Sequence, residues 1–207
     1  MLTQRLEMLL GMYGDAEVAE LLSEEATIGY WLRVEAALAR AQGELGLLDP
    51  VDAAAIVEAV DTLKIDTDRL WAETRTVGYP ILPLVRQLDE ALPIEHRGRV
   101  HYGATTQDVM DSGLAVQLDH ACLRLGKLLG RFGDALAGLA EKHADTVLAG
   151  RTHAMHAVPT TFGAKLASYL GELARHRERL DAARRRVAVV SLFGAGGTSA
   201  GYGPAAP

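Results

Sequence analysis

The stretch DSGLAVQLDHACLRLGKLLGRFGDALAGLAEKH, residues 111–143, decides the fold of this chain. Its apolar residues recur in steps of three or four, at Leu114, Leu118, Cys122, Leu125, Leu129, Phe132, Leu136 and Leu139. This spacing puts them on one face of a helix, which we expect to run from about Thr106 to His143. A helix rises about 1.5 Å per residue, so this one would span about 55 Å. A domain of this size cannot cover it alone, and we expect partner helices.

A second long helix is predicted from about Pro159 to Val189. Its apolar face is formed by Phe162, Leu166, Leu170, Leu173 and Leu180. Small residues recur on it at a spacing of four, at Gly163, Ala167 and Gly171, and would let another helix approach closely. Two long helices with a short connection predict an antiparallel bundle that other subunits complete.

The rest of the chain is also predicted to be helical. Asp15 is a suitable cap for a helix to about Gly46, and Asp49 with Pro50 begins another. Shorter helices are expected over 66–77 and 80–92. No clear strand is found, and the best candidate, VAVVSLFG at 187–194, continues a helical pattern. We therefore predict an all-α protein: an N-terminal helical domain, 1–98, and the first long helices of a central bundle, 99–207.

Composition excludes several classes of protein. With 207 residues, 49% of them hydrophobic, the chain can bury a core. Its net charge is -6 and its basic residues are interspersed with acidic ones, so nucleic acid is not an expected partner. The single cysteine excludes an internal disulfide, the N-terminus does not have the pattern of a signal peptide, and every apolar run is too short for a membrane span. The expected location is the cytoplasm.

Two polar clusters adjoin the long helices. HYGATTQDVMDSG, residues 101–113, precedes and enters the first, and GRTHAMHAVPTT, residues 150–161, precedes the second. The hydroxyls of Thr105 and Thr106, together with the free N–H groups of a helix start, could hold a carboxylate. The alternative is that these threonines only cap helices. The presence of histidine and threonine in both clusters favours a binding site.

Other chemistries have weaker support. His153 and His156 could belong to a metal site, but neither an HExxH motif nor a cysteine pair accompanies them. The segment GAGGTSAGYG, residues 194–203, does not have the GK[ST] ending of a phosphate loop, and the chain contains no GxSxG motif. Cys122 lies on the apolar face and is a poor nucleophile candidate. We therefore predict neither a metal nor a cofactor.

Three segments resemble the fumarase/aspartase, or class II fumarase, superfamily: HYGATTQD at 101–108, GRTH at 150–153 and AVPTTFGAKL at 157–166. GATTQD and VGYPILPLVRQL, residues 77–88, are most similar to 3-carboxy-cis,cis-muconate cycloisomerases, and next to adenylosuccinate lyases. The resemblance implies an all-α homotetramer whose active sites combine segments of three subunits. It implies a polycarboxylate substrate, proton removal by a base, and a doubly charged aci-carboxylate intermediate stabilised by hydrogen-bond donors.

The resemblance also assigns roles to residues. Thr105 and Thr106 would bind a substrate carboxylate, and Thr152 and His153 would form a second wall in which His153 is the proton donor. The remaining substrate-binding positions would be His101, Gln107 and Arg151. Asp108 is expected to fix the loop.

This chain departs from the family pattern at several points. Met155 replaces the glutamine of an RTHxQ segment, and His153 stands where many muconate cycloisomerases have tryptophan. The segment TVGYP, residues 76–80, does not contain the histidine usual in adenylosuccinate lyases. The serine loop SSxMPxKxN, which supplies the base in the family, has no match. We therefore expect an N-terminal fragment that does not catalyse alone, with a fumarate-releasing carbon–nitrogen lyase or a catalytically inactive helical assembly as the alternatives.

Overall fold

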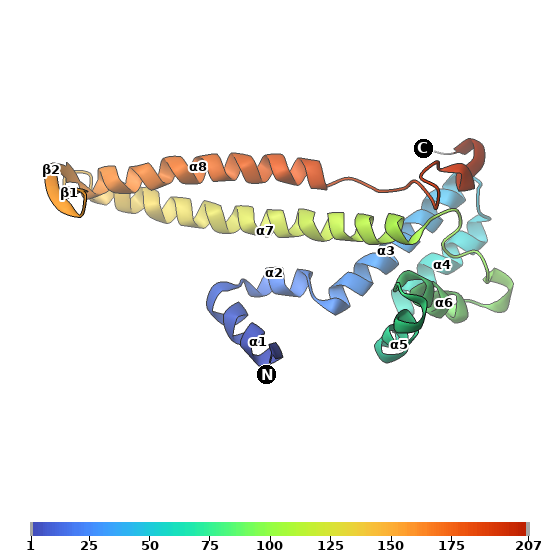
Figure 1. The fold of residues 1–207 in the computed structure, drawn as a ribbon. Helices are drawn as coiled ribbons and strands as arrows, with labels where there is room; N and C mark the ends of the chain where they lie inside the picture. The colour runs from blue at the N-terminus through green and yellow to red at the C-terminus, as the bar shows by residue number, and fades with distance from the viewer. Residues whose placement is uncertain (1, 206–207) are drawn as a thin grey trace. The chain divides into compact units, whose positions relative to one another are not determined.

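In a computed structural model, the described part of the chain is residues 2–205, with side chains described for 8–203. Helices dominate this part, and the all-α prediction is confirmed (Figure 1). The elements in chain order are α1 (Leu2–Tyr13), α2 (Ala16–Leu21), α3 (Glu24–Glu44), α4 (Pro50–Thr62), α5 (Thr67–Val77), α6 (Ile81–Ala91), η1 (Ile94–His96), α7 (Thr106–Lys142), β1 (Val147–Thr152), β2 (Met155–Thr161), α8 (Phe162–Val187) and η2 (Ala200–Ala205).

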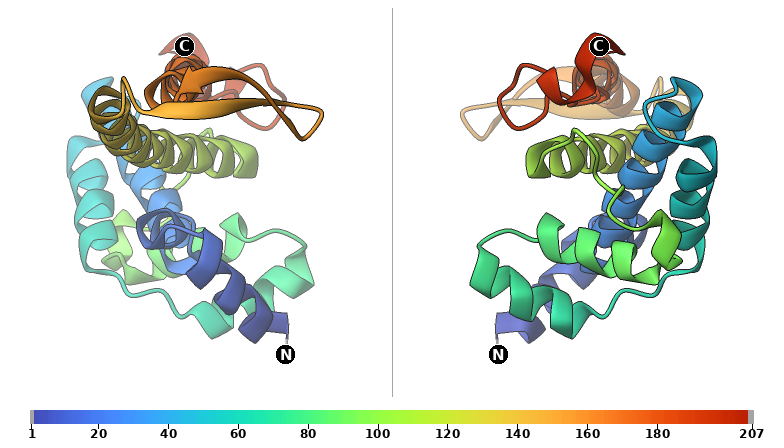
Figure 2. Two further views of the ribbon diagram at one scale, coloured as in Figure 1. Left: turned by 90° about the vertical axis from the view of Figure 1, so that its left-hand side faces the viewer. Right: turned by 90° about the vertical axis from the view of Figure 1, so that its right-hand side faces the viewer.

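The chain forms two compact units, which we call the first and second units. The first unit is Met1–Gln117 with Val189–Pro207, and the second is Leu118–Ala188. In the first unit α4 packs against α3 and α6, and α5 packs against α6 (Figure 2). Its core contains fully buried side chains, among them Ile56, Leu70, Ile81, Leu84 and Leu88. The division into these two units does not test the domain boundary expected between residues 98 and 99, which stays a prediction.

Helix caps read from the sequence are present in the first unit. Asp15, Asp49 and Asp66 each accept a backbone N–H from the first turn of the following helix, at 3.1, 2.8 and 2.9 Å. The single helix expected from Asp15 to Gly46 is wrong, because a break separates α2 from α3. Ser23 explains the break, since its Oγ accepts the N–H of Ala26 at 3.1 Å and so starts a new helix.

The second unit contains an antiparallel pair made by α8 and the part of α7 from Leu118 onward, together with the two strands between them (Figure 1). Glycines allow the two helices to approach. A Cβ at Gly133 would lie 3.2 Å from Leu173, and one at Gly163 would lie 2.5 Å from the carbonyl oxygen of Ala140. The predicted close approach is confirmed at Gly163, whereas Ala167 and Gly171 are exposed.

Much of the apolar face of these helices is exposed in the single chain. Leu136 and Leu166 are buried, but Phe132 is 55% exposed and Tyr169 is 49% exposed. Leu125 and Leu139 are also exposed. The pair of helices therefore buries only part of the stripe from which it was predicted.

The expectation that the chain contains no strand is wrong. Strands β1 and β2 form an antiparallel hairpin, with Val147 opposite Thr161 and Thr152 opposite Met155. Pro159 consequently belongs to β2, and α8 begins only at Phe162, after Thr161 caps it by accepting the N–H of Ala164 at 3.1 Å. The segment 187–194, the best strand candidate from the sequence, forms no strand.

Within residues 2–205, no helix combines the length and the apolar character needed to cross a membrane.

An ion pair joins α7 and α8 within the second unit. Nε of Arg184 donates to Oδ1 of Asp119 at 2.6 Å, and a second guanidinium nitrogen donates to Oδ2 at 3.3 Å. The hydrogen bond from Arg184 holds the pKa of Asp119 below its usual value of 3.8. Since this pKa is lower in the folded state, the stabilisation is present above the unfolded pKa and is lost as the pH falls through the folded one.

We predict that Asp119→Asn abolishes this acid dependence. Wild type and variant should differ in unfolding free energy at pH 7 and converge as the pH falls from about 4, near the unfolded pKa, through the lower folded pKa, where wild-type Asp119 becomes neutral. The measurement is urea unfolding followed by circular dichroism at several pH values. Arg184→Gln should give the same curve as Asp119→Asn and as the double variant. A constant difference at all pH values would contradict this role of the pair.

Candidate active site

Asp108 organises the start of α7. Its carboxylate is buried and accepts three backbone N–H groups: that of Thr105 at 3.0 Å, that of Phe193 at 2.9 Å and that of Gly194 at 2.9 Å. The bond to Thr105 closes the first turn of the helix, as the acidic residue of a capping box does. The other two bind the segment that follows α8. The expectation that Asp108 fixes the loop is confirmed.

The C-terminal segment, residues 189–205, covers the loop before α7. Ser112 and Ser191 form two reciprocal hydrogen bonds of 3.0 Å. Tyr202 is buried against Gly103, where a Cβ would lie 2.6 Å from the tyrosine ring. Gly103 also has a φ of 74°, so the position suits only glycine. The glycine-rich segment therefore has a packing role next to the first cluster.

Helix α3 supplies two buried polar side chains beneath the same loop. Oε1 of Glu35 lies 2.6 Å from Nδ1 of His101, and Nε2 of Gln42 donates to the carbonyl of Tyr102 at 2.7 Å. Glu35 is 1% exposed and Gln42 is 3% exposed. Neither residue was predicted from the sequence. The available signal was a carboxylate and an amide on the apolar face of a helix, positions at which such groups are buried only when they are bonded.

Tyr202 carries the one strongly shifted phenol in the described part of the chain. Burial, and then the negative charges of Asp108 and Glu35, raise the pKa of Tyr202 to about 12. Neither the Tyr202 hydroxyl nor Oε2 of Glu35 has a hydrogen-bond partner within the described residues. The buried part of the first cluster therefore contains the neutral phenol of Tyr202 near the carboxyl groups of Asp108 and Glu35.

The predicted substrate-binding residues of the first cluster lie at the N-terminal end of α7. Thr105 and Thr106 are half-buried, and their hydroxyls form no hydrogen bond within the part of the chain that is described. The N–H of Thr105 is occupied by Asp108, so an anion would meet the hydroxyls and the N–H groups of the following turn. The side-chain amide of Gln107 donates to Asp111 at 2.9 Å and would have to leave it to reach a ligand.

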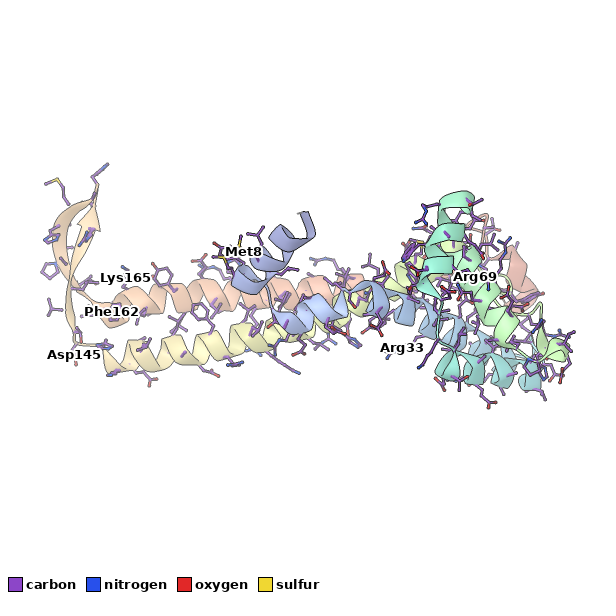
Figure 3. The ribbon with its side chains drawn as sticks, turned by 90° about the horizontal axis from the view of Figure 1, so that it is seen from below. Met8, Arg33, Arg69, Asp145, Phe162 and Lys165 are labelled. Carbon is purple, nitrogen blue, oxygen red and sulfur yellow. The ribbon has the colours of Figure 1, made fainter. Side chains whose placement is uncertain are left out.

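The second cluster occupies the tip of the hairpin. His153 and Ala154 form its two-residue turn, with φ values of 46° and 60°, as a type I′ turn requires. Arg151, Thr152 and His153 are exposed, and side chains of the hairpin project away from the ribbon beyond Asp145 and Phe162 (Figure 3). His153 was expected just before the second long helix. It lies instead in a turn between two strands, and β2 separates it from α8.

Each cluster lies in its own unit. His101, Thr105, Thr106 and Gln107 belong to the first unit, and Arg151, Thr152 and His153 belong to the second. The residues of one cluster thus share a unit, whereas the two clusters belong to different units. In the described part of the chain, no group of three His, Cys, Asp or Glu side chains is arranged to hold a metal ion.

The described sequence and fold match known lyases. The family model described as Lyase matches residues 15–207. The chain belongs to the fumarase/aspartase superfamily. It is 42% identical over 192 residues to a 3-carboxy-cis,cis-muconate cycloisomerase of Pseudomonas aeruginosa and 39% identical over 191 residues to an adenylosuccinate lyase of Pyrococcus abyssi. A solved structure, a fumarate lyase from Mesorhizobium sp. BNC1, superposes with a TM-score of 0.89 at 41% identity.

The superfamily match covers most of this chain but less than half of each relative. The alignments cover 91% of the chain and 42% of the cycloisomerase, and 92% of the chain and 42% of the adenylosuccinate lyase. For the Mesorhizobium structure the shares are 93% of this chain and 45% of that chain. The chain thus spans somewhat under half the length of these superfamily members.

We predict that Asp108→Asn destabilises the first unit by about 1–3 kcal/mol, because a side-chain amide places a donor against a buried backbone N–H that needs an acceptor. Both tryptophans, Trp31 and Trp71, lie in this unit, so their fluorescence during urea unfolding reports its stability. Asp111→Asn is the matched control at an exposed position of the same helix and should change stability by less than about 0.5 kcal/mol. Equal effects of the two substitutions would contradict the assigned role.

Proposed function

We propose that the protein to which this chain belongs acts on a polycarboxylate in the manner of a 3-carboxy-cis,cis-muconate cycloisomerase. The observation that carries the proposal is the N-terminal end of α7, where Asp108 fixes the first turn and the hydroxyls of Thr105 and Thr106 have no hydrogen-bond partner among the described residues. Donors held in advance stabilise charge that develops during a reaction without reorganising. The 42% identity to the Pseudomonas aeruginosa cycloisomerase supports this substrate class.

The chemistry follows from the groups at that helix start. In the elimination direction a base takes a carbon-bound proton next to a carboxylate, which becomes an aci-carboxylate with two negative charges, and this intermediate then expels the leaving group. Lactonisation of a muconate runs the other way: a carboxylate oxygen adds to a double bond, and the resulting aci-carboxylate is then protonated on carbon. Thr105 and Thr106 donate to its oxygens through their hydroxyls, and N–H groups of the first turn add further donors. His101 and Gln107 bind the rest of the substrate.

In this proposal the second cluster forms the other side of the substrate-binding site. His153 is the proton donor, and Thr152 and Arg151 contact the substrate. Helix α7 alone has 37 residues and therefore rises about 55 Å between its ends. We propose that the hairpin reaching a given α7 start comes from another subunit. The exposed apolar residues of α7 and α8 support an oligomer, with a homotetramer as the proposed form.

A second candidate is a fumarate-releasing carbon–nitrogen lyase. The 39% identity to the adenylosuccinate lyase of Pyrococcus abyssi favours it, as does a histidine at position 153. The two candidates share the stabilised aci-carboxylate intermediate, but the lyase breaks a carbon–nitrogen bond whereas the cycloisomerase forms a carbon–oxygen bond. A catalytically inactive assembly role is the third candidate, favoured by the same exposed apolar faces.

Ligand binding tests the role of the first cluster. We expect the chain to bind 3-carboxy-cis,cis-muconate in calorimetry, and Thr106→Val to weaken the binding about tenfold or more, because a hydrogen bond to a charged group is lost at nearly constant volume. Thr62→Val, at an exposed threonine near the end of α4, is the control and should leave the affinity unchanged. A variant that loses stability without losing affinity would instead support a capping role for Thr106.

Turnover tests the role of His153. We expect no turnover of 3-carboxy-cis,cis-muconate or adenylosuccinate by the chain alone, and turnover of one of them after addition of the C-terminal segment of the Pseudomonas aeruginosa cycloisomerase that this chain does not match. His153→Ala should then lower the rate about a hundredfold or more, as loss of one acid–base group does. His176→Ala, at an exposed histidine of α8, should retain the wild-type rate. Activity of the chain alone would contradict the need for an added base, and full activity of His153→Ala would contradict its role.

A further inference from the structure

Glu35 is a buried acid that forms a single hydrogen bond. It lies on α3 with 1% exposure, and its Oε1 is 2.6 Å from Nδ1 of His101. Its other oxygen has no partner within the described residues. Burying a carboxylate costs free energy that one bond does not recover, and apolar residues at such positions are often equally stable. The residue therefore calls for an explanation other than stability.

The contact decides which nitrogen of His101 carries a hydrogen. An ionised carboxylate only accepts hydrogen bonds, so Nδ1 must be the donor. Nε2 is then the nitrogen left for a ligand, and it has no partner within the described residues. A carboxylate behind a histidine fixes both the tautomer and the direction of the ring in the same way at many metal sites.

Other contacts hold the backbone of the loop. His101 has a φ of 66°, a conformation that a non-glycine residue keeps only when its surroundings enforce it. Gln42 holds the carbonyl of Tyr102, and Tyr202 packs on Gly103. These contacts hold Tyr102 and Gly103, the two residues that follow His101. Glu35, in contrast, contacts the imidazole ring itself, so its specific effect is on the ring.

We propose that Glu35 is a positioning residue, which holds the hydrogen of His101 on Nδ1 and presents Nε2 to the substrate. The inference rests on the proposed function, in which His101 binds a polycarboxylate. Substrate carboxylates accept hydrogen bonds, so the ring takes up a proton on Nε2 when it binds one, while Nδ1 continues to donate to Glu35. Glu35 thereby gives His101 one fixed orientation toward the anion instead of two.

The test is nitrogen NMR of the imidazole rings in the ¹⁵N-labelled chain, with the His101 signals assigned from His101→Gln. In the neutral ring of the wild type, we expect the protonated shift on Nδ1 and the unprotonated shift on Nε2. Glu35→Gln keeps the shape but offers an N–H donor as well as an acceptor, so the hydrogen should move to Nε2 in a large fraction of molecules. Gln42→Leu is the matched control, since it loosens the same loop and should leave the hydrogen on Nδ1.

A second arm separates this inference from the proposed function. We expect Glu35→Gln to bind 3-carboxy-cis,cis-muconate about tenfold more weakly than the wild type. A tautomer change without any binding, even by the wild type, would support the control of His101 by Glu35 and contradict the proposed function. Binding by the wild type with the same tautomer in Glu35→Gln would overturn the positioning role alone. A wild-type neutral ring with its hydrogen on Nε2 would overturn it whether or not the variant folds.

Discussion

The arrangement of the start of α7 and of the segment after α8 depends on one buried carboxylate, Asp108, and its three backbone N–H donors. One donor is in the first turn of α7 and the other two are in the segment after α8, up to 86 residues further along the chain. A single charge therefore joins the start of a helix to a remote loop. Without it, the N–H of Gly194 would be buried without an acceptor. The position of the glycine-rich segment, and with it that of Tyr202, follows from this contact.

In the first cluster, buried residues support the side chains that we propose to bind the substrate. Glu35, Gln42 and Tyr202 lie below the loop, are each less than 5% exposed, and come from α3 and the C-terminal segment. Thr105 and Thr106 are half-buried beside the same loop, and their hydroxyls form no hydrogen bond within the described residues. Side chains that bind a substrate perform best when the residues behind them are fixed by packing and hydrogen bonds. The second cluster has the opposite character, because its residues are exposed on a hairpin.

The helices could be predicted because their signals are local. Asp49 and Asp66 are followed within a few residues by the N–H groups that they accept, so the sequence itself shows the cap. The leucine spacing of α7 likewise predicts its length. The hairpin could not be read in this way, because its exposed and half-buried residues do not alternate along the strands. Its turn also has histidine and alanine where glycine or asparagine is usual. The bond from His101 to Glu35 joins residues 66 positions apart, and no local pattern reports such a distance. The threonines and histidines of both clusters were found only because they occur together and resemble a family.

The packing of Tyr202 on Gly103 has a consequence for the order in which the protein folds. Residues 118–188 form their own compact unit between the two parts of the first unit, so this contact closes a long loop in the chain. Contacts of high sequence separation are slow to form, because the entropy lost in closing the loop precedes the gain. During synthesis, α3 to α6 can pack as soon as they leave the ribosome. The contact between Gly103 and Tyr202 cannot form until α7, the hairpin and α8 have all been translated.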